Sequence, residues 1–134
     1  MSSDTLQKVL CAEDEPLIQA ILRAALERVG GFTVRICGSG EEAVAAAPEF
    51  APDLILLDVM MPGMDGRATL AALRKLPSLE HTPIAFITTI GGSREIDDFL
   101  ELGAVGIIMK PFEPKALAET VQRIWANARA RNPG

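Results

Sequence analysis

Five residues that could do chemistry stand in the same kind of position, directly after a short apolar run. They are Glu13, Asp14, Asp58, Thr88 and Lys110. Continuous aliphatic runs are typical of strands buried on both faces of a parallel sheet, and such a sheet presents its chemistry at the carboxyl ends of its strands. We therefore expect three carboxylates, a hydroxyl and an ammonium group to lie together at one edge of a sheet.

The three acids suit a magnesium-assisted transfer of a phosphoryl group. A carboxylate can attack phosphorus and hold the phosphoryl group as an acyl phosphate, and we expect Asp58 to be this nucleophile. Acids that share one edge repel each other, which raises the pKa of one of them unless a cation is bound. Mg²⁺ takes one or two protein carboxylates and bridges to phosphate oxygens. We expect its ligands to come from Glu13, Asp14, Asp58 and the backbone carbonyl of Met60.

Thr88 and Lys110 would complete the site around the phosphoryl group. The threonine can donate a hydrogen bond to a phosphoryl oxygen, and the lysine places a positive charge opposite the anion. Positioning and charge stabilisation supply most of the catalysis of phosphoryl transfer. Taken singly, an aspartate after a strand is usually a turn or cap residue, and a lone lysine is usually solvated. The joint placement of the five residues at four strand ends favours the site.

The apolar pattern switches between strand and helix along the whole chain. Strands are expected at about 9–12, 32–36, 53–57, 84–87 and 105–109, and helices at about 18–29, 39–48, 65–76, 93–103 and 114–131. Gly30-Gly31 and Gly103 are expected to end helices, and Pro114 suits a first helical turn. Five β/α repeats with short connections predict an α/β fold, doubly wound around a parallel sheet.

The size of the chain fits one domain with one hydrophobic core. It has 134 residues, of which 49% are hydrophobic, which suffices for a core but leaves no room for a second domain. We expect the folded domain to cover 6–131, with flexible ends at 1–5 and 132–134.

Composition argues against several classes of function. A net charge of −5 with scattered basic residues predicts no direct binding of nucleic acid. No apolar run approaches the ~20 residues that span a membrane, and the first residues do not resemble a signal peptide. We therefore expect a cytoplasmic protein with no membrane partner. Cys11 and Cys37 are predicted to be small buried residues in a reducing compartment, and with His81 they offer too few ligands for a zinc site.

The chain resembles the response-regulator receiver domains of two-component signalling. The resemblance runs from Val9 to Trp125 and is carried by Glu13-Asp14, the segment from Asp58 to Gly66, Thr88, and Lys110-Pro111-Phe112. It implies a flavodoxin-like fold with five helices and strand order 2-1-3-4-5. It also implies that the Lys110-Pro111 peptide bond is cis.

The resemblance further implies a role for each residue of the site. Asp58 would accept a phosphoryl group from the phosphohistidine of a histidine kinase. Asp14 and Asp58 would bind Mg²⁺ directly, and Glu13 would act mainly through water. Thr88 and Lys110 would contact the phosphoryl group.

The chain departs from the usual family pattern near the site. The residue three before the lysine is usually an aromatic that moves inward on activation, and here it is Ile107; the residue after Thr88 is usually small, and here it is Thr89. Met60 and Ile90 occupy two positions that tune the lifetime of the phosphoryl group in this family. Both are apolar and cannot hydrogen-bond an attacking water, so we predict slow self-dephosphorylation, which Met60→Asn should accelerate.

These observations together predict a free-standing phosphoacceptor switch with no fused output domain. It would catalyse only its own phosphorylation and dephosphorylation. Its expected partners are a sensor histidine kinase or histidine phosphotransfer protein, a downstream protein target and, when phosphorylated, a second copy of itself. We expect the helices at 91–103 and 114–131 to present the changed surface, with Gly91 and Gly92 as hinges.

Three other functions fit parts of the sequence. A receiver-like adaptor or dimerisation module that works without phosphorylation is favoured slightly by Ile107. A metal-dependent phosphohydrolase would need a second acid near the nucleophile, but the second residue after Asp58 is Met60. A nucleotide-binding site would rest on Gly38-Ser39-Gly40, which lacks the glycine spacing of the phosphate-binding loops.

Overall fold

The computed structural model describes residues 5–89 and 92–131. The ends predicted to be flexible, apart from Thr5, therefore lie outside the described residues. The same holds for Gly91, one of the two expected hinges, and for Ile90, one of the two positions expected to tune phosphoryl lifetime.

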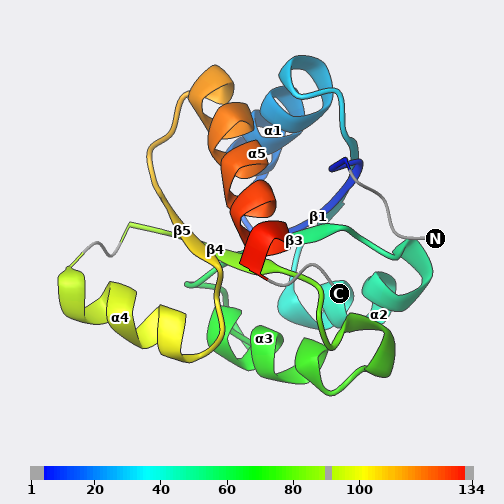
Figure 1. The fold of residues 1–134 in the computed structure, drawn as a ribbon, viewed down its shortest axis with the longest axis vertical. Helices are drawn as coiled ribbons and strands as arrows, with labels where there is room; N and C mark the ends of the chain where they lie inside the picture. The colour runs from blue at the N-terminus through cyan, green and yellow to red at the C-terminus, as the bar shows by residue number, and fades with distance from the viewer. Residues whose placement is uncertain (1–4, 90–91, 132–134) are drawn as a thin grey trace.

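Five parallel strands form one sheet at the centre of the molecule (Figure 1). The strands are β1 (Lys8–Ala12), β2 (Thr33–Cys37), β3 (Leu54–Asp58), β4 (Ile84–Thr88) and β5 (Gly106–Met109). Their order across the sheet is β2-β1-β3-β4-β5, and every neighbouring pair is parallel. The predicted strand order and the predicted parallel sheet are both confirmed.

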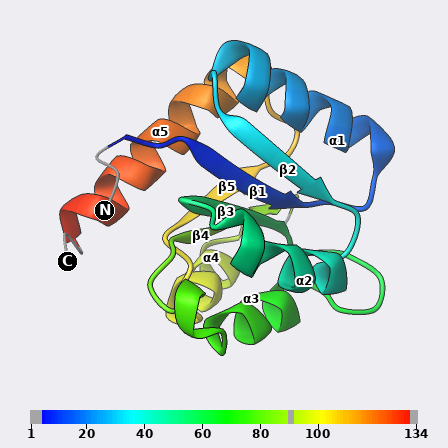
Figure 2. The same ribbon diagram turned by 90° about the vertical axis from the view of Figure 1, so that its right-hand side faces the viewer.

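Helices cover both faces of the sheet. They are α1 (Pro16–Arg23), which continues as the π-helix η1 (Ala24–Val29), α2 (Gly40–Phe50), α3 (Gly66–Arg74), the short 3-10 helix η2 (Pro77–Leu79), α4 (Ser93–Glu101) and α5 (Pro114–Arg131). Two views show that α1 and α5 lie on one face, whereas α2, α3 and α4 lie on the other (Figures 1 and 2). This is the doubly wound arrangement that alternating strands and helices predict.

Alternate strand residues fill two hydrophobic clusters, one on each face of the sheet. In β3, Leu54 and Leu56 pack with residues of α1, η1 and α5, whereas Ile55 and Leu57 pack with residues of α2, α3 and α4. All four side chains are fully buried. A strand covered on both faces needs apolar residues at every position, which explains why its sequence is a continuous aliphatic run.

Two strands extend one residue further than the apolar runs predict. Asp58 and Thr88 are the last residues of β3 and β4. Backbone pairing continues past the aliphatic residues, because the Val59 N–H donates to the Ile87 carbonyl at 3.0 Å and the Lys110 N–H donates to the Thr88 carbonyl at 2.9 Å. The two polar side chains are therefore held by the sheet itself.

Several helix boundaries differ from those predicted, and one helix changes its hydrogen bonding. The helix expected to end near Pro48 continues to Phe50, although Pro48 has no N–H to bond to the preceding turn. Burial of Ala47 and partial burial of Phe50 in the core outweigh that missing bond. The helix expected over 18–29 changes to π-helical hydrogen bonding at Ala24, and the Gly30 N–H donates to Ala25, five residues earlier.

Gly66 gives a stability test of the turn that follows β3. A Cβ at this position would lie 2.6 Å from the Asp58 carbonyl oxygen and 2.8 Å from the Val59 Cα. We expect Gly66→Ala to lower the free energy of unfolding by about 1–3 kcal/mol, because the backbone that carries Asp58 must shift. Urea denaturation followed by the fluorescence of the single tryptophan, Trp125, measures this change.

Gly38→Ala is the matched control for this test. A Cβ at Gly38 would meet nothing closer than 3.7 Å, so the substitution should leave the urea midpoint almost unchanged. Equal effects of the two substitutions would contradict the close packing inferred for Gly66.

Candidate functional site

The sheet gathers the five predicted residues at the carboxyl ends of its strands. Glu13 and Asp14 follow β1, Asp58 and Thr88 end β3 and β4, and Lys110 follows β5. The four strands β1, β3, β4 and β5 lie side by side in the sheet. Glu13 and Lys110, which are 97 positions apart in the sequence, therefore meet at the same edge.

The three acids form one compact cluster. Each of Glu13, Asp14 and Asp58 offers a carboxylate oxygen, and these oxygens all lie within 4.8 Å of one another. Glu13 is fully buried and Asp58 is 4% exposed, whereas Asp14 is partly exposed. The cluster therefore has two acids in the protein interior and one at its border with solvent.

Lys110 bridges the two buried acids. Its Nζ lies 3.0 Å from Glu13 Oε1 and donates a hydrogen bond to Asp58 Oδ1 at 3.2 Å. The side chain is 15% exposed, so solvent screens these ion pairs only in part. The Lys110-Pro111 peptide bond is cis, as the family resemblance implies.

Burial and ion pairing oppose each other at Glu13. Burial raises the pKa of this carboxyl above its usual range, and the contacts with Lys110 and with the Glu15 N–H act against that rise. Burial alone would lower the pKa of Lys110, but its interactions with Glu13 and Asp58 outweigh burial and raise it. Both effects come from a single ammonium group that compensates two carboxylates in the interior.

One oxygen of Glu13 is left without a hydrogen-bond donor among the described residues. Oε2 accepts the Glu15 N–H at 3.1 Å. Oε1 forms an ion pair with the Lys110 ammonium at 3.0 Å but has no hydrogen-bond partner among the described residues. A buried carboxylate oxygen in this condition can accept a further ligand. Together with the hard oxygen donors of Asp14 and Asp58, it makes the cluster chemically suited to Mg²⁺.

Gln19 positions the loop that carries two of the acids, and sequence reasoning did not identify it. Its side-chain amide donates to the Glu13 carbonyl oxygen at 2.6 Å from the first turns of α1. A glutamine on a helix has no spacing signal that distinguishes it from a solvated residue, so only the structure shows this contact.

Met60 is exposed beside the site. This residue, which occupies one of the two positions expected to tune phosphoryl lifetime, is 67% exposed. Met60 lies in the turn after β3, beyond the last paired residue, so nothing packs over it as the sheet packs over β3. Thr88, in contrast, is buried and lies at the end of β4, as expected for a residue that faces the cluster.

Ile107 lies where receiver domains usually carry an aromatic residue. It is partly buried and pairs in register with Phe86 of β4. Both belong to the cluster on the α4 face, where the Phe86 ring lies 5.0 Å from the Phe99 ring of α4 at an angle of 58°. The aromatic pair that packs in the same cluster as Ile107 is therefore supplied by β4 and α4.

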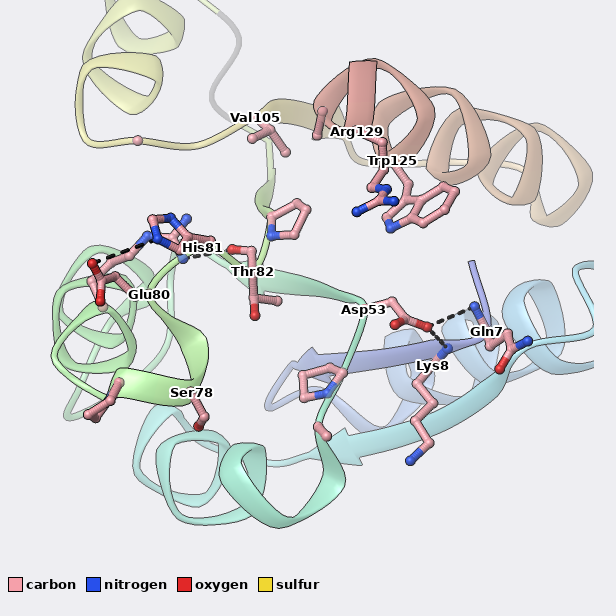
Figure 3. A pocket seen from close by; sticks show the side chains of 17 residues that line it. Gln7, Lys8, Asp53, Ser78, Glu80, His81, Thr82, Val105, Trp125 and Arg129 are labelled. Atoms are coloured by element: carbon pink, nitrogen blue, oxygen red, sulfur yellow. Dashed lines mark hydrogen bonds and ion pairs between the residues drawn. The ribbon is translucent and has the colours of Figure 1, made fainter. Parts of the chain in front are cut away.

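A hollow lies at the end of the sheet opposite the acidic cluster (Figure 3). Its volume is about 990 Å³, and its lining includes Lys8, Asp53 and Val105, which begin or immediately precede strands. Asp53 turns toward the start of β1 and accepts the N–H groups of Gln7 and Lys8 at 3.0 and 2.9 Å. Its carboxylate therefore ties β1 to β3 and is not part of the acidic cluster.

A model of the response regulator receiver domain matches residues 9–122. The chain belongs to this family. The MtrA DNA-binding response regulator of Mycolicibacterium smegmatis is 37% identical over 120 residues, which are 89% of this chain and 51% of the relative. The probable transcriptional regulator ycf27 of Guillardia theta is 36% identical over 121 residues, 90% of this chain and 46% of the relative. The receiver chain thus spans about half the length of these curated relatives.

Solved structures agree with this assignment. The chemotaxis response regulator CheY4 of Vibrio cholerae is similar with a TM-score of 0.83 and 33% identity, over 90% of this chain and 99% of that one. A response regulator from Chloroflexus aurantiacus gives a TM-score of 0.81 and 32% identity, over 91% and 99% of the two chains. The resemblance proposed from the motifs and the flavodoxin-like fold are both confirmed. Among residues 5–89 and 92–131, no helix is long and apolar enough to cross a bilayer.

The charge balance in the receiver site can be measured by substitution. We expect Lys110→Met to lower the free energy of unfolding by about 3 kcal/mol, because it leaves buried carboxylates uncompensated. Glu13→Gln removes one of these charges. In the Glu13→Gln background, Lys110→Met should therefore lower the free energy of unfolding by less, and the difference, which is the coupling energy of the two residues, should be about 1–3 kcal/mol. Urea denaturation of the wild type, both single variants and the double variant measures the coupling.

Lys115→Met is the control for loss of a lysine. Lys115 is exposed in the first turn of α5, so its substitution should change the free energy of unfolding by less than about 0.5 kcal/mol. Strictly additive effects of Lys110→Met and Glu13→Gln would show that the 3.0 Å contact contributes nothing to stability.

Proposed function

We propose that this receiver domain accepts a phosphoryl group on Asp58 from the phosphohistidine of a sensor histidine kinase or a histidine phosphotransfer protein. The observation that carries the proposal is the convergence of three carboxylates within 4.8 Å, with Lys110 in contact with two of them. A structural ion pair would need one acid and one base. Three acids against one lysine leave an excess of carboxylates that a divalent cation would offset, and the bound cation would in turn offset the negative charge of the phosphoryl group.

The transfer forms one bond to phosphorus and breaks another. A carboxylate oxygen of Asp58 attacks the phosphorus atom of phosphohistidine, and the P–N bond breaks. The electron pair of that bond goes to the imidazole nitrogen, and the ring leaves as neutral imidazole because it was protonated on its other nitrogen. The aspartate then carries an acyl phosphate, a known form of covalent catalysis by carboxylates.

Mg²⁺ would be held by oxygen ligands of the receiver site. Asp14, Asp58 and the backbone carbonyl of Met60 would bind it directly, and Glu13 would act through water. When bound, the ion neutralises charge on the carboxylates and on the phosphoryl oxygens. The buried Glu13 oxygen without a hydrogen-bond donor among the described residues supports this assignment.

Lys110 and Thr88 would recognise the transferred group. The Lys110 ammonium already lies 3.2 Å from the Asp58 oxygen Oδ1, so it is placed to stabilise negative charge that arrives on that carboxylate. Thr88 sits at the adjacent strand end and would donate its hydroxyl to a phosphoryl oxygen. On this proposal the domain catalyses only its own phosphorylation and dephosphorylation.

The phosphorylated surface would be read by a protein partner. The names of the MtrA relatives include DNA binding, but this chain matches only about half of those proteins and carries a net charge of −5. A negatively charged receiver surface has no general attraction for nucleic acid. We therefore propose that a downstream protein, or a second phosphorylated copy, binds the altered surface.

Phosphorylation by a small-molecule donor tests the proposal directly. With acetyl phosphate and Mg²⁺, the wild type should gain one phosphoryl group by intact-protein mass spectrometry, and hydroxylamine should remove it. Asp58→Asn should gain none, because an amide is not a nucleophile of this kind. Asp65→Asn is the matched control in the same loop, since Asp65 caps α3 by accepting the Ala68 N–H and asparagine caps equally well.

The same experiment separates the switch from a phosphorylation-independent adaptor. Beryllofluoride with Mg²⁺ should bind the wild type and Asp65→Asn but not Asp58→Asn. If the folded wild type neither gains phosphate nor binds beryllofluoride, the phosphoacceptor function is wrong and the adaptor function that Ile107 favours takes its place.

A further inference from the structure

The sulfur atoms of the described residues fall into two groups of very different accessibility. The thiols of Cys11 and Cys37 are both buried. Burial raises the pKa of both, for Cys37 to about 11. A thiol must be ionised and accessible to react quickly with an oxidant, so these cysteines are protected on both counts.

The accessible thioethers lie around the phosphorylation site. Met60, two residues after Asp58, is 67% exposed, and Met109, which pairs in register with Thr88 and precedes Lys110, is 41% exposed. Met61 is only 6% exposed and Met64 is partly buried. A thioether reacts without losing a proton, so exposure decides which one is oxidised first.

We propose that Met60 is an oxidation site, with Met109 as a second one, and that the Met60 sulfoxide shortens the life of the phosphoryl group on Asp58. The oxidation site stands on the exposure of these sulfurs alone. The effect on phosphoryl lifetime rests on the proposed function of Asp58. The oxidant class is a hydroperoxide, with hydrogen peroxide as the simplest member.

The oxidation transfers one oxygen atom to sulfur. The sulfur lone pair attacks one peroxide oxygen, the O–O bond breaks, and the second oxygen leaves as water after it takes up the displaced proton. Sulfur loses two electrons and peroxide gains them. A flexible apolar side chain becomes a polar one with a strong hydrogen-bond acceptor.

This change matters because of where Met60 lies. Loss of the phosphoryl group requires a water oxygen to bond to phosphorus while the bond from phosphorus to the Asp58 oxygen breaks. The products are the aspartate carboxylate and dihydrogen phosphate, which retains both hydrogens of the water. An apolar thioether two residues from Asp58 cannot orient that water, whereas a sulfoxide oxygen can accept its hydrogen bond.

Peptide mapping tests the oxidation site without any phosphorylation. The folded protein is treated with a limited amount of hydrogen peroxide, which catalase then removes. The protein is next denatured, its free thiols are labelled, and its peptides are analysed by mass spectrometry. Met60 should gain oxygen fastest, Met109 next and Met61 slowest, with both cysteines still open to labelling. Oxidation of Met61 as fast as Met60, or loss of the thiols first, would overturn the proposal.

Phosphoryl lifetime tests the consequence. Oxidised and untreated proteins are phosphorylated with acetyl phosphate and Mg²⁺, and the remaining acetyl phosphate is removed. Loss of the phosphoryl group is then followed over time by mass spectrometry. Oxidation should accelerate loss several-fold in the wild type. Met60→Leu removes the sulfur, so its rate of phosphoryl loss should be the same before and after peroxide treatment. Met60→Gln should lose the phosphoryl group faster than Met60→Leu even without peroxide.

The outcomes separate this inference from the proposed function. If untreated wild type takes up phosphate but its oxidised form loses it no faster, the regulatory inference is wrong and the function of Asp58 stands. If untreated wild type takes up no phosphate, the proposed function and the regulatory consequence both fail, while the peptide map still decides the oxidation site. Recovery of the slow rate after treatment with methionine sulfoxide reductases is the expected reversal.

Discussion

One ammonium group between two buried carboxylates determines how this receiver site is built. Glu13 is fully buried and Asp58 nearly so, and each lies within 3.2 Å of the Lys110 Nζ. Burial of either acid without that charge would cost several kcal/mol, and in practice such an acid takes up a proton instead. The Lys110 ammonium therefore offsets part of the cost of burying these two acids at the edge of the sheet. Because compensation is incomplete, with three acids to one base, the site keeps an affinity for further positive charge.

The parallel sheet supplies the precision that this charge balance needs. Two of the reactive residues, Asp58 and Thr88, are themselves paired members of strands, so their backbone positions are fixed by hydrogen bonds to neighbouring strands. Glu13 is fixed less directly, through the bond from Gln19 to its carbonyl oxygen and the bond from Glu15 to its side chain. The two residues held within strands are thus Asp58, the expected nucleophile, and Thr88, the expected hydrogen-bond donor to the phosphoryl group. The other expected cation ligands, Glu13, Asp14 and Met60, lie in the connecting loops, where small movements cost less.

The sequence pattern predicted the parallel sheet and the convergence of the acids, because both follow from a simple rule, whereas the strand order was implied by the family resemblance. Strands buried on both faces must be aliphatic, so a polar residue at the end of such a run, here Asp58, marks the carboxyl edge. Features that depend on tertiary packing were not predictable in this way. The passage of α2 through Pro48 reflects the core contacts of Ala47 and Phe50. The exposure of Met60 likewise follows from the path of a turn, which residue type does not encode.

Ile107 stands where the family resemblance implies an aromatic residue, and the aromatic rings beside it come from β4 and α4. Ile107 pairs with Phe86, and Phe86 packs against Phe99 of α4, whose ring is covered in turn by the Arg67 guanidinium at 5.1 Å. Phe86 stands two residues before Thr88 on the same face of β4, since strand residues alternate between faces. The ring pair of Phe86 and Phe99 therefore connects β4 with α4 by close packing, which tolerates little change in spacing. Ile107 of β5 supplies aliphatic surface beside this pair, and Lys110, which follows β5, contacts Asp58.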